Sequence, residues 1–373
     1  MENPFLFGTA TKHEWFIDRE SDTERLSTNF RNGVNSILIS PRRWGKTSLV
    51  HKVADIVQDT AIKVVVMDMF SCKTEKDFYT IFATQIIKQT ASRWEEWVEN
   101  AKQFLSAVTP KFSFGADPMN EFAISIDFSN KQLNEEILKL PQKIADEKGI
   151  KIVVCIDEFQ QIAEIGDSIT FQKKLRSVWQ LQDVTYCLYG SKKHLLNAIF
   201  SKQSMPFYKF GDVIFLQKID AIHWIPYICN QFAKTGKNIS EKLAQRICQT
   251  VENHSSYVQQ FAWLVWLRTE QTADETAFEQ ALQDLLDQNS MLFYAYSEGL
   301  TALQLNFLRA LANDVNSQFS HKEILQKYDL GASANIARVK KALENKELVD
   351  ISRNIIIFND PVFKIWFKKE FLI

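Results

Sequence analysis

Apolar runs of four to six residues alternate with helical patterns through the first 218 residues of the chain. Five of these runs have the composition of buried β-strands: residues 36–39, 62–67, 152–156, 184–189 and 213–216. Amphipathic periodicity predicts helices between them, from residue 46 onward and at 77–89, 131–148 and 171–180, with a kink or break at Pro141. Strands buried on both faces and separated by helices predict an α/β fold with a parallel sheet covered by helices.

An alternating pattern interrupts this order between about residues 110 and 130. Phe112 and Phe114 precede the turn residues 115–118, and apolar residues alternate again from Phe122 to Phe128. A period of two around a Gly- and Pro-containing turn is typical of a β-hairpin. We therefore expect a hairpin inserted into the α/β core.

Strand signals stop near residue 219, where a helical part begins. Residues 219–290 are expected to form a small helical domain, with helix, loop and helix between 224 and 268. Residues 291–373 carry helical patterns at 302–311, 322–328 and 334–344, followed by apolar segments at 348–351 and 355–358. Three helices and a terminal hairpin predict a winged helix-turn-helix, so the chain is expected to have three domains: 1–218, 219–290 and 291–373.

Composition narrows the class of protein. The chain has 373 residues, with 44 Lys and Arg against 45 Asp and Glu, a balance that excludes a polycation or an acidic tail. The five cysteines are scattered singly and the six histidines do not cluster, which argues against a zinc site or a disulfide framework. The first residues do not resemble a signal peptide and no run approaches about 18 apolar residues, so we expect a cytoplasmic protein without a membrane span.

The strongest chemical signal is the segment SPRRWGKT at residues 40–47. It matches the phosphate-binding P-loop pattern GxxxxGK[ST] except at Ser40, and it lies between a predicted strand and a predicted helix, as the pattern requires. Backbone N–H groups at a helix N-terminus bind phosphate, and Gly45 allows close approach of the backbone. Lys46 is expected to reach the β- and γ-phosphates, and the Thr47 hydroxyl to ligate Mg²⁺. The candidate nucleotide-binding residues of this segment are Ser40, Pro41, Arg42, Arg43, Trp44, Gly45, Lys46, Thr47 and Ser48. The alternative is a Gly-Lys-Thr that merely opens a helix.

Two carboxylates end the most apolar strand, at the edge of the sheet where open α/β sheets bind ligands. Asp157 is the candidate second Mg²⁺ ligand, and Glu158 is placed to orient and polarise an attacking water. The alternative is that both side chains cap the next helix. Ser191, just after another strand, is a candidate sensor of the γ-phosphate, although a simple turn residue would fit as well. Arg176 is the candidate arginine finger, with a solvated helix face as its alternative.

These segments together resemble the P-loop ATPases of the AAA+ and STAND type, especially the archaeal-type ATPase family that also occurs in bacteria. The resemblance rests on residues 16–22, 40–47, 156–160 and 189–191. It implies a core with strand order 5-1-4-3-2, a helical lid and a C-terminal winged helix. It also implies that Arg19 and Glu20 lie near the adenine, within a segment that departs from the family pattern at Asp18 and Asp22.

The resemblance bears on the lid as well. Residues 253–257 (NHSSY) fall where relatives carry a Gly-x-Pro motif that contacts the base, and they depart from it. A strong sensor-2 arginine is not matched either. Both departures favour a slow or switch-like ATPase over a processive motor.

The C-terminal domain contains an excess of basic residues that could bind a partner. Between residues 335 and 353 five basic residues stand against three acidic ones, an excess of 5 − 3 = +2. Asn335, Arg338 and Lys341 share one helix face that could enter a DNA groove. The alternative is a solvated helix on an adaptor domain, since winged helices also bind proteins.

These features together predict an ATPase that uses ATP/ADP and Mg²⁺, is slow or partner-stimulated, and couples its nucleotide to a winged helix that contacts DNA or a protein. Nucleotide-dependent self-association is a further expectation. The alternative is a non-hydrolysing, nucleotide-bound DNA-binding regulator or a protein-interaction adaptor.

Overall fold

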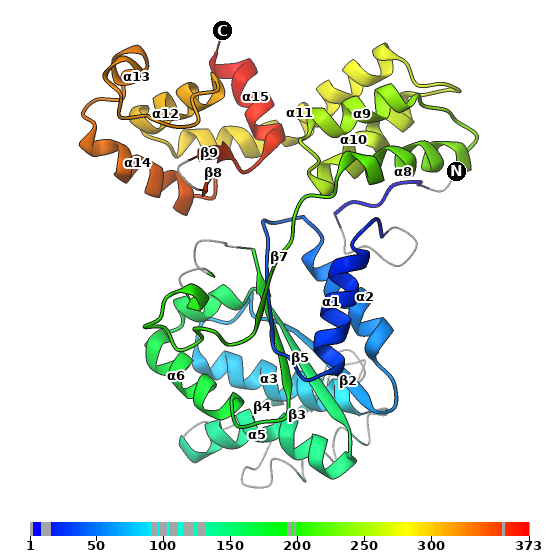
Figure 1. Ribbon diagram of the computed structural model, residues 1–373, viewed down its shortest axis with the longest axis vertical. Coiled ribbons are helices and arrows are strands. Elements are labelled where there is room, and N and C mark those ends of the chain that lie inside the picture. Colours follow the sequence, from blue (N-terminus) through cyan, green and yellow to red (C-terminus); the bar gives the residue numbers. More distant parts are fainter. Residues whose placement is uncertain are drawn as a thin grey trace. The chain divides into compact units, whose positions relative to one another are not determined.

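The chain divides into two compact units (Figure 1). The computed structural model describes residues 3–8, 16–91, 96, 103, 111–114, 122–125, 131–191, 196, 199–352 and 355–372. The core unit is Arg19–Gln217, and the helical unit combines Met1–Asp18 with Lys218–Ile373. The expected core domain began at residue 1, whereas the structure places the N-terminal segment with the helical unit, where Phe5 packs on Tyr227 and Phe232.

A parallel five-stranded sheet forms the middle of the core unit, as the sequence predicts. Its strands are β1 (Ser36–Ile39), β2 (Ile62–Asp68), β5 (Lys151–Asp157), β6 (Thr185–Gly190) and β7 (Asp212–Phe215). Their order is β2-β5-β6-β1-β7, and all neighbouring pairs are parallel. Numbered consecutively this is 2-3-4-1-5, the same order as 5-1-4-3-2 read from the other edge, so the expected topology is confirmed.

Helices cover both faces of this sheet (Figure 1). The core-unit helices are α1 (Glu20–Arg31), α2 (Lys46–Val57), α3 (Glu75–Thr90), α5 (Lys131–Lys148), the 3₁₀ turn η2 (Phe159–Glu164) and α6 (Ser168–Trp179). One apolar cluster joins α3, α5 and α6 to alternate strand residues such as Ile37 and Ile39. Leu38, between them, is also fully buried, on the face that α1 and α2 cover. At β1 both faces of the sheet are therefore buried, which explains the continuous apolar run of this strand.

An aromatic cluster anchors the end of α6 to the sheet. Trp179 is buried and stacks on Tyr186 of β6, with ring centroids 4.3 Å apart. Phe82 stacks on the same indole from α3 at 6.3 Å, and Phe207 packs on it from the segment before β7. Large aromatic rings bury more apolar area than other side chains, so this cluster is a main contribution to the stability of the core unit.

A kink or a break was predicted at Pro141, and the break is wrong. Helix α5 continues from Lys131 to Lys148 with Pro141 inside it. Proline removes one backbone hydrogen bond and crowds the preceding turn. The neighbouring Leu138, Leu140 and Ile144 are fully buried, and their packing in the core outweighs this local cost.

The predicted hairpin insertion is confirmed for the residues that the structure describes. Strands β3 (Lys111–Phe114) and β4 (Phe122–Ser125) pair antiparallel, with Phe114 opposite Phe122. The expected turn residues 115–118, and Ile126 and Phe128, lie outside the described residues.

The helical unit holds a lid-like group of helices and a winged helix. Three helices stand where helix, loop and helix was expected: α8 (Ala221–Lys234), α9 (Glu241–Thr250) and α10 (Ser255–Arg268). The long α11 (Glu275–Glu298) runs across the boundary expected at 290/291. The winged helix follows with α12 (Ala302–Ala312), α13 (Lys322–Lys327), α14 (Ala334–Asn345), β8 (Val349–Ser352), β9 (Ile355–Phe358) and α15 (Pro361–Phe371), the last of which the sequence pattern did not predict.

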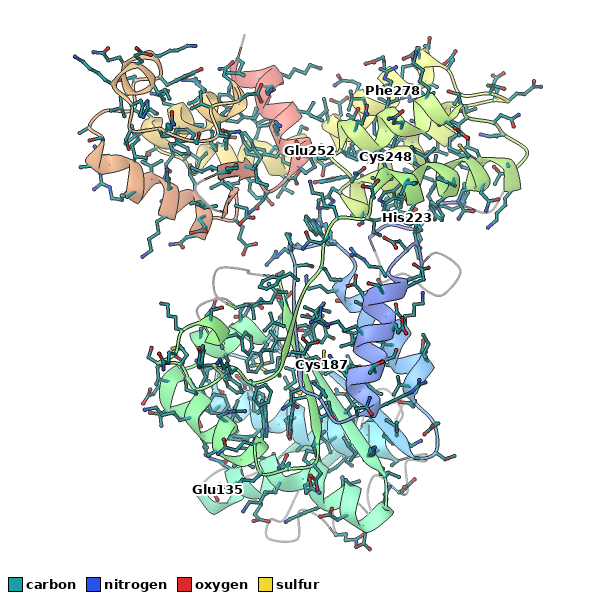
Figure 2. The ribbon with its side chains drawn as sticks, in the orientation of Figure 1. Glu135, Cys187, His223, Cys248, Glu252 and Phe278 are labelled. Atoms are coloured by element: carbon teal, nitrogen blue, oxygen red, sulfur yellow. The ribbon has the colours of Figure 1, made fainter. Side chains whose placement is uncertain are left out.

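Side chains from distant positions meet inside each unit (Figure 2). All five cysteines are free thiols, and Cys187 is buried within β6, opposite Ser36 of β1. In the helical unit, Phe278 of α11 packs on Phe261 of α10 at 5.0 Å. Within the described part of the chain, every helix is too short or too polar to cross a membrane.

Replacing Trp179 with alanine tests the aromatic cluster. We expect Trp179→Ala to lower the free energy of unfolding of the core unit by about 3–5 kcal/mol, because it removes a buried indole and leaves a cavity. The control is Leu181→Ala, since Leu181 is 83% exposed, and its effect should stay within about 0.5 kcal/mol. Denaturant unfolding followed by near-UV circular dichroism measures both, and equal effects of the two changes would contradict the interpretation.

Candidate nucleotide site

The P-loop leaves β1 and closes around the side chain of Lys46. Two residues of the loop have positive φ angles, Arg43 at 63° and Gly45 at 91°, and Gly45 directly precedes α2. A residue with this φ is strained unless it is glycine, which explains Gly45. The Lys46 Nζ is buried and donates to the backbone oxygens of Ser40 and Pro41, both at 3.2 Å. The loop therefore presents its lysine in a fixed place at the N-terminus of α2.

The nine predicted loop residues differ in exposure. Ser40, Lys46 and Ser48 are buried, Arg42 and Arg43 are exposed, and Pro41, Trp44, Gly45 and Thr47 are half-buried.

Thr47 and Asp157 lie together, although they are 110 positions apart in the sequence. The Thr47 Oγ1 donates to Asp157 Oδ2 at 2.9 Å, and Asp157 Oδ1 accepts from the backbone N–H of Glu158 at 2.8 Å. Hydroxyl and carboxylate oxygens are ligands that Mg²⁺ prefers, and this ion is usually held by one or two protein groups together with phosphate and water. Over the residues described, no group of three or more His, Cys, Asp or Glu forms a complete metal cage. The oxygen atoms of Thr47 and Asp157 are donors that fit a Mg²⁺ ion with further ligands from phosphate or water.

The Glu158 carboxylate faces the end of the neighbouring strand β6. Ser191 donates its hydroxyl to Glu158, with Oγ 3.2 Å from Oε2 and 3.4 Å from Oε1. Gln160 Nε2 donates to the same Oε2. Glu158 has a φ of 50° and occupies the N-cap position of η2, yet its side chain makes no capping hydrogen bond with the described residues there. Its carboxylate therefore belongs to this cluster and not to a helix cap.

One further hydrogen bond connects the cluster to an arginine of the P-loop. Arg42 Nε donates to the Ser191 Oγ at 3.4 Å. The structure thus brings together Lys46, Thr47, Asp157, Glu158 and Ser191, all of which the sequence singled out. Gln160, which the sequence analysis did not single out as a site residue, also contacts Glu158. Its signal in the sequence is a polar residue two positions after the carboxylate, but only the fold shows what it contacts.

Burial dominates the electrostatics of the cluster. It lowers the pKa of Lys46 from 10.5 to about 8, opposed by the nearby Asp157 and Glu158 carboxylates. Burial also raises the pKa of Asp157 to about 6, opposed by the hydrogen bonds from Thr47 and from the Glu158 N–H. Both groups would be better stabilised in their charged forms by a ligand of the opposite charge, a phosphate chain for Lys46 and a cation for Asp157.

Arg19 contacts the P-loop from the start of the core unit. Its side chain is buried, and its Nη2 donates to the Trp44 carbonyl oxygen at 3.2 Å while Nη1 pairs with Asp22 at 3.2 Å. Its φ of 79° turns the chain into α1. Glu20, the first residue of α1, is exposed. An adenine contact of either residue stays a prediction.

The structure does not bring Arg176 to this cluster. Its guanidinium lies over the Phe210 ring, 4.8 Å from the ring centroid. Phe210 lies just before β7, at the amino end of that strand. Arg176 is in the last turn of α6, which runs antiparallel to the strands and ends near their amino ends. Asp157 and Ser191 lie at the opposite, carboxyl ends of the strands. The arginine finger therefore stays a prediction that these contacts do not support.

Residues 253–257, the expected lid motif, belong to the helical unit. There Tyr257 is buried and donates its hydroxyl to Asp360 at 2.5 Å, at the start of α15. This contact joins α10 to the start of α15 in the winged helix. A contact of the segment with a base stays a prediction.

Comparisons with known proteins agree with the architecture. A family model described as a probable winged helix domain matches residues 291–369. No curated protein matches the chain. Among solved structures, the Walker-type ATPase of Pyrococcus abyssi is similar over 98% of this chain and 99% of its own, with 16% identity and a TM-score of 0.69.

Two further solved structures are similar to this chain over almost their whole length. The Aeropyrum pernix ORC2 protein in ADPNP-ADP complexes shares 14% identity over 99% of this chain and 100% of its own, with a TM-score of 0.58. The A. pernix ORC1 protein in complex with DNA shares 11% identity over 95% of this chain and 93% of its own, with a TM-score of 0.50. The chain therefore has the fold of a P-loop ATPase that ends in a winged helix domain.

Replacing Lys46 with methionine tests the burial of its charge. Because the pKa of folded Lys46 lies below its unfolded value, the buried ammonium destabilises the fold fully below about pH 8, and this cost fades between pH 8 and 10.5. Without nucleotide, we expect Lys46→Met to raise the free energy of unfolding at pH 7 by about 1–3 kcal/mol, and the gain to shrink toward pH 10.5.

Denaturant titrations at several pH values measure this effect. Lys52→Met, a half-buried lysine on the same helix, serves as the control for the loss of a charge. A Lys46→Met protein that is less stable than the wild type at pH 7 would contradict the interpretation.

Proposed function

We propose that this protein binds ATP and ADP together with Mg²⁺ and hydrolyses ATP. The observation that carries the proposal is the meeting of Lys46, Thr47, Asp157 and Glu158 at one edge of the sheet, with Thr47 hydrogen-bonded to Asp157 at 2.9 Å. The fold shared with a Walker-type ATPase and with a protein solved in ADPNP-ADP complexes supports it.

Different residues of the cluster would bind the phosphates, hold the metal and accept the proton. The P-loop N–H groups and Lys46 would bind the phosphates, and Thr47 and Asp157 would hold the metal. Mg²⁺ would neutralise charge on the β- and γ-phosphate oxygens. Glu158 would accept a proton from the attacking water. The oxygen of that water would bond to the γ-phosphorus, while the bond from the γ-phosphorus to the oxygen that bridges it to the β-phosphate breaks.

The same site can act as a switch. Arg19 is the first residue of the core unit, and its guanidinium bonds the P-loop backbone at Trp44. Asp18, the last residue of the preceding segment, also has a positive φ, of 55°. A change in the P-loop on nucleotide binding would therefore change the contact of Arg19, and with it the backbone at Asp18 and Arg19, where the chain passes from one unit to the other.

The partner of the winged helix is DNA or a protein. Arg338 and Lys341 are exposed on α14, and Arg338 donates to Asn335 at 3.1 Å, which places these two side chains on one face. Lys341 follows Arg338 by three positions, a spacing that puts it beside Arg338 on a helix. The ORC1 structure in complex with DNA, which has the same fold, favours DNA. The exposed Ile355 and Ile357 on β9 favour the second candidate, a protein-binding adaptor.

Two substitutions separate binding from hydrolysis. We expect Lys46→Ala to weaken nucleotide binding and abolish phosphate release, because it removes the buried ammonium. Glu158→Gln should retain ATP within a few-fold of the wild-type affinity yet slow turnover by about 10²–10⁴, because the amide cannot take the proton of the attacking water. Calorimetry and steady-state phosphate release measure the two steps. Lys173→Ala, which removes an exposed lysine on α6, is the control and should leave turnover within about twofold; equal activity in wild type, Lys46→Ala and Glu158→Gln would refute an ATPase at this site.

DNA binding is tested by its dependence on salt. If α14 contacts phosphates, Arg338→Ala/Lys341→Ala should weaken the binding of duplex DNA about tenfold and reduce the slope of log K against log salt by about 1–2. The control, Lys234→Ala/Lys242→Ala, removes two exposed lysines from α8 and α9 and gives the same change in net charge. Gel shifts of the full chain over a salt series measure both, and no shift at any salt would leave the protein-binding role.

A further inference from the structure

Gln160 is a buried polar side chain that contacts the candidate catalytic carboxylate. It lies in η2, two residues after Glu158, and its side chain is fully buried. Its Nε2 donates to Glu158 Oε2. The reverse orientation of the amide would place Oε1 against the carboxylate, so that two hydrogen-bond acceptors would face each other. The carboxylate therefore requires that the amide nitrogen, and not the amide oxygen, point toward it.

Strand β6 provides the space that this amide occupies. A Cβ atom at Gly190 would lie 1.9 Å from Gln160 Oε1 and 3.1 Å from Gln160 Cδ, but 3.5 Å from the nearest backbone atom, the Glu158 Cα. Gly190 lies outside the positive-φ region, so its backbone conformation does not require glycine. The missing side chain is therefore explained by the room that Gln160 needs.

The amide and the Ser191 hydroxyl do different things for Glu158. The hydroxyl rotates and is already shared, since Ser191 accepts from Arg42 while it donates to Glu158. If Ser191 turns its hydrogen toward a γ-phosphate, Glu158 loses that donor. The Gln160 amide is buried between Glu158 and Gly190, where Nε2 bonds the carboxylate and Oε1 makes no hydrogen bond to the described residues. The bond from Nε2 does not depend on which way Ser191 points.

We propose that Gln160 is a positioning residue that holds the Glu158 carboxylate in place for attack of water on the γ-phosphate, with Gly190 as the gap that admits its side chain. This inference rests on the proposed ATP hydrolysis. The amide bonds Oε2 and leaves lone pairs of Oε1 for the water. A shift of about 1 Å in a catalytic group can cost about 10² in rate, so loss of the amide acts on turnover and not on the affinity for nucleotide.

The first test replaces Gln160 with methionine, which keeps the volume and removes the donor. We expect kcat for phosphate release to fall about 10–100-fold, while KM for ATP and the dissociation constant of Mg²⁺-ADP stay within about twofold. Rates are expressed per site that binds ADP, so a misfolded fraction does not count. The matched control is Gln172→Met on α6, because Gln172 is equally buried and, among the described residues, makes no hydrogen bond to Glu158.

The second test is a double-mutant cycle between Gln160 and Gly190. Gly190→Ala should lower kcat as Gln160→Ala does, because the new Cβ displaces the amide. In the Gln160→Ala protein the same Cβ has room, so Gly190→Ala should change kcat by less than about twofold there. A purely structural role of either residue predicts additive losses instead.

The outcomes distinguish the inference from the proposed function. Wild-type turnover that Glu158→Gln abolishes, with unchanged kcat in Gln160→Met or additive losses in the cycle, would overturn the role of Gln160 and leave the ATPase standing. Absence of turnover in the wild type, with and without DNA, would overturn both. Falls in kcat at constant KM, together with a non-additive cycle, support the inference.

Discussion

The whole site depends on one constraint: a buried ammonium and two carboxylates must be held at the same edge of the sheet. Strands β1 and β5 are not neighbours, because β6 lies between them. The register sets Ile39 opposite Gly190 and Ile156 opposite Leu188, so the three strands end at nearly the same level. The hydrogen bond of 2.9 Å from Thr47 to Asp157 crosses this arrangement, and it exists only while all three strands keep their register.

The sequence predicted the parts of the fold whose signal is local. All five parallel strands were found because each is a continuous apolar run. The inner strands β1, β5 and β6 are buried on both faces, whereas β7 at the end of the sheet exposes Val213 and Phe215. The order of the strands came from the resemblance and not from the pattern. Helix α1 was missed because it buries polar residues such as Thr23, Ser27 and Asn29, which weakens its apolar periodicity. Helix α11 crosses an expected domain boundary. It packs on α10 and on α15, so different sides of the helix are buried along its length, and the sequence pattern does not show one continuous helix.

The site was predictable to the extent that residue type and position after a strand specify a role. Lys46, Thr47, Asp157, Glu158 and Ser191 met that condition, and the structure brings them together. Gln160 did not, because its role requires Gly190, which is 30 positions away on another strand. Arg176 was chosen for its charge on a helix, and a charge alone does not show that its side chain lies over the Phe210 ring.

The charges in the cluster constrain how a nucleotide can enter it. The buried Lys46 ammonium interacts with two carboxylates, Asp157 and Glu158, so this cluster would be short of positive charge before a phosphate chain arrived. Phosphates brought in alone would lie beside both carboxylates in a region of low dielectric, where repulsion is strong. A divalent cation at Thr47 and Asp157 removes this repulsion, and the exposed Arg42 and Arg43 on the same loop add positive charge from the solvent side. If the proposed ATPase activity holds, its dependence on a metal would follow from the charge balance of this cluster as much as from the chemistry of phosphoryl transfer.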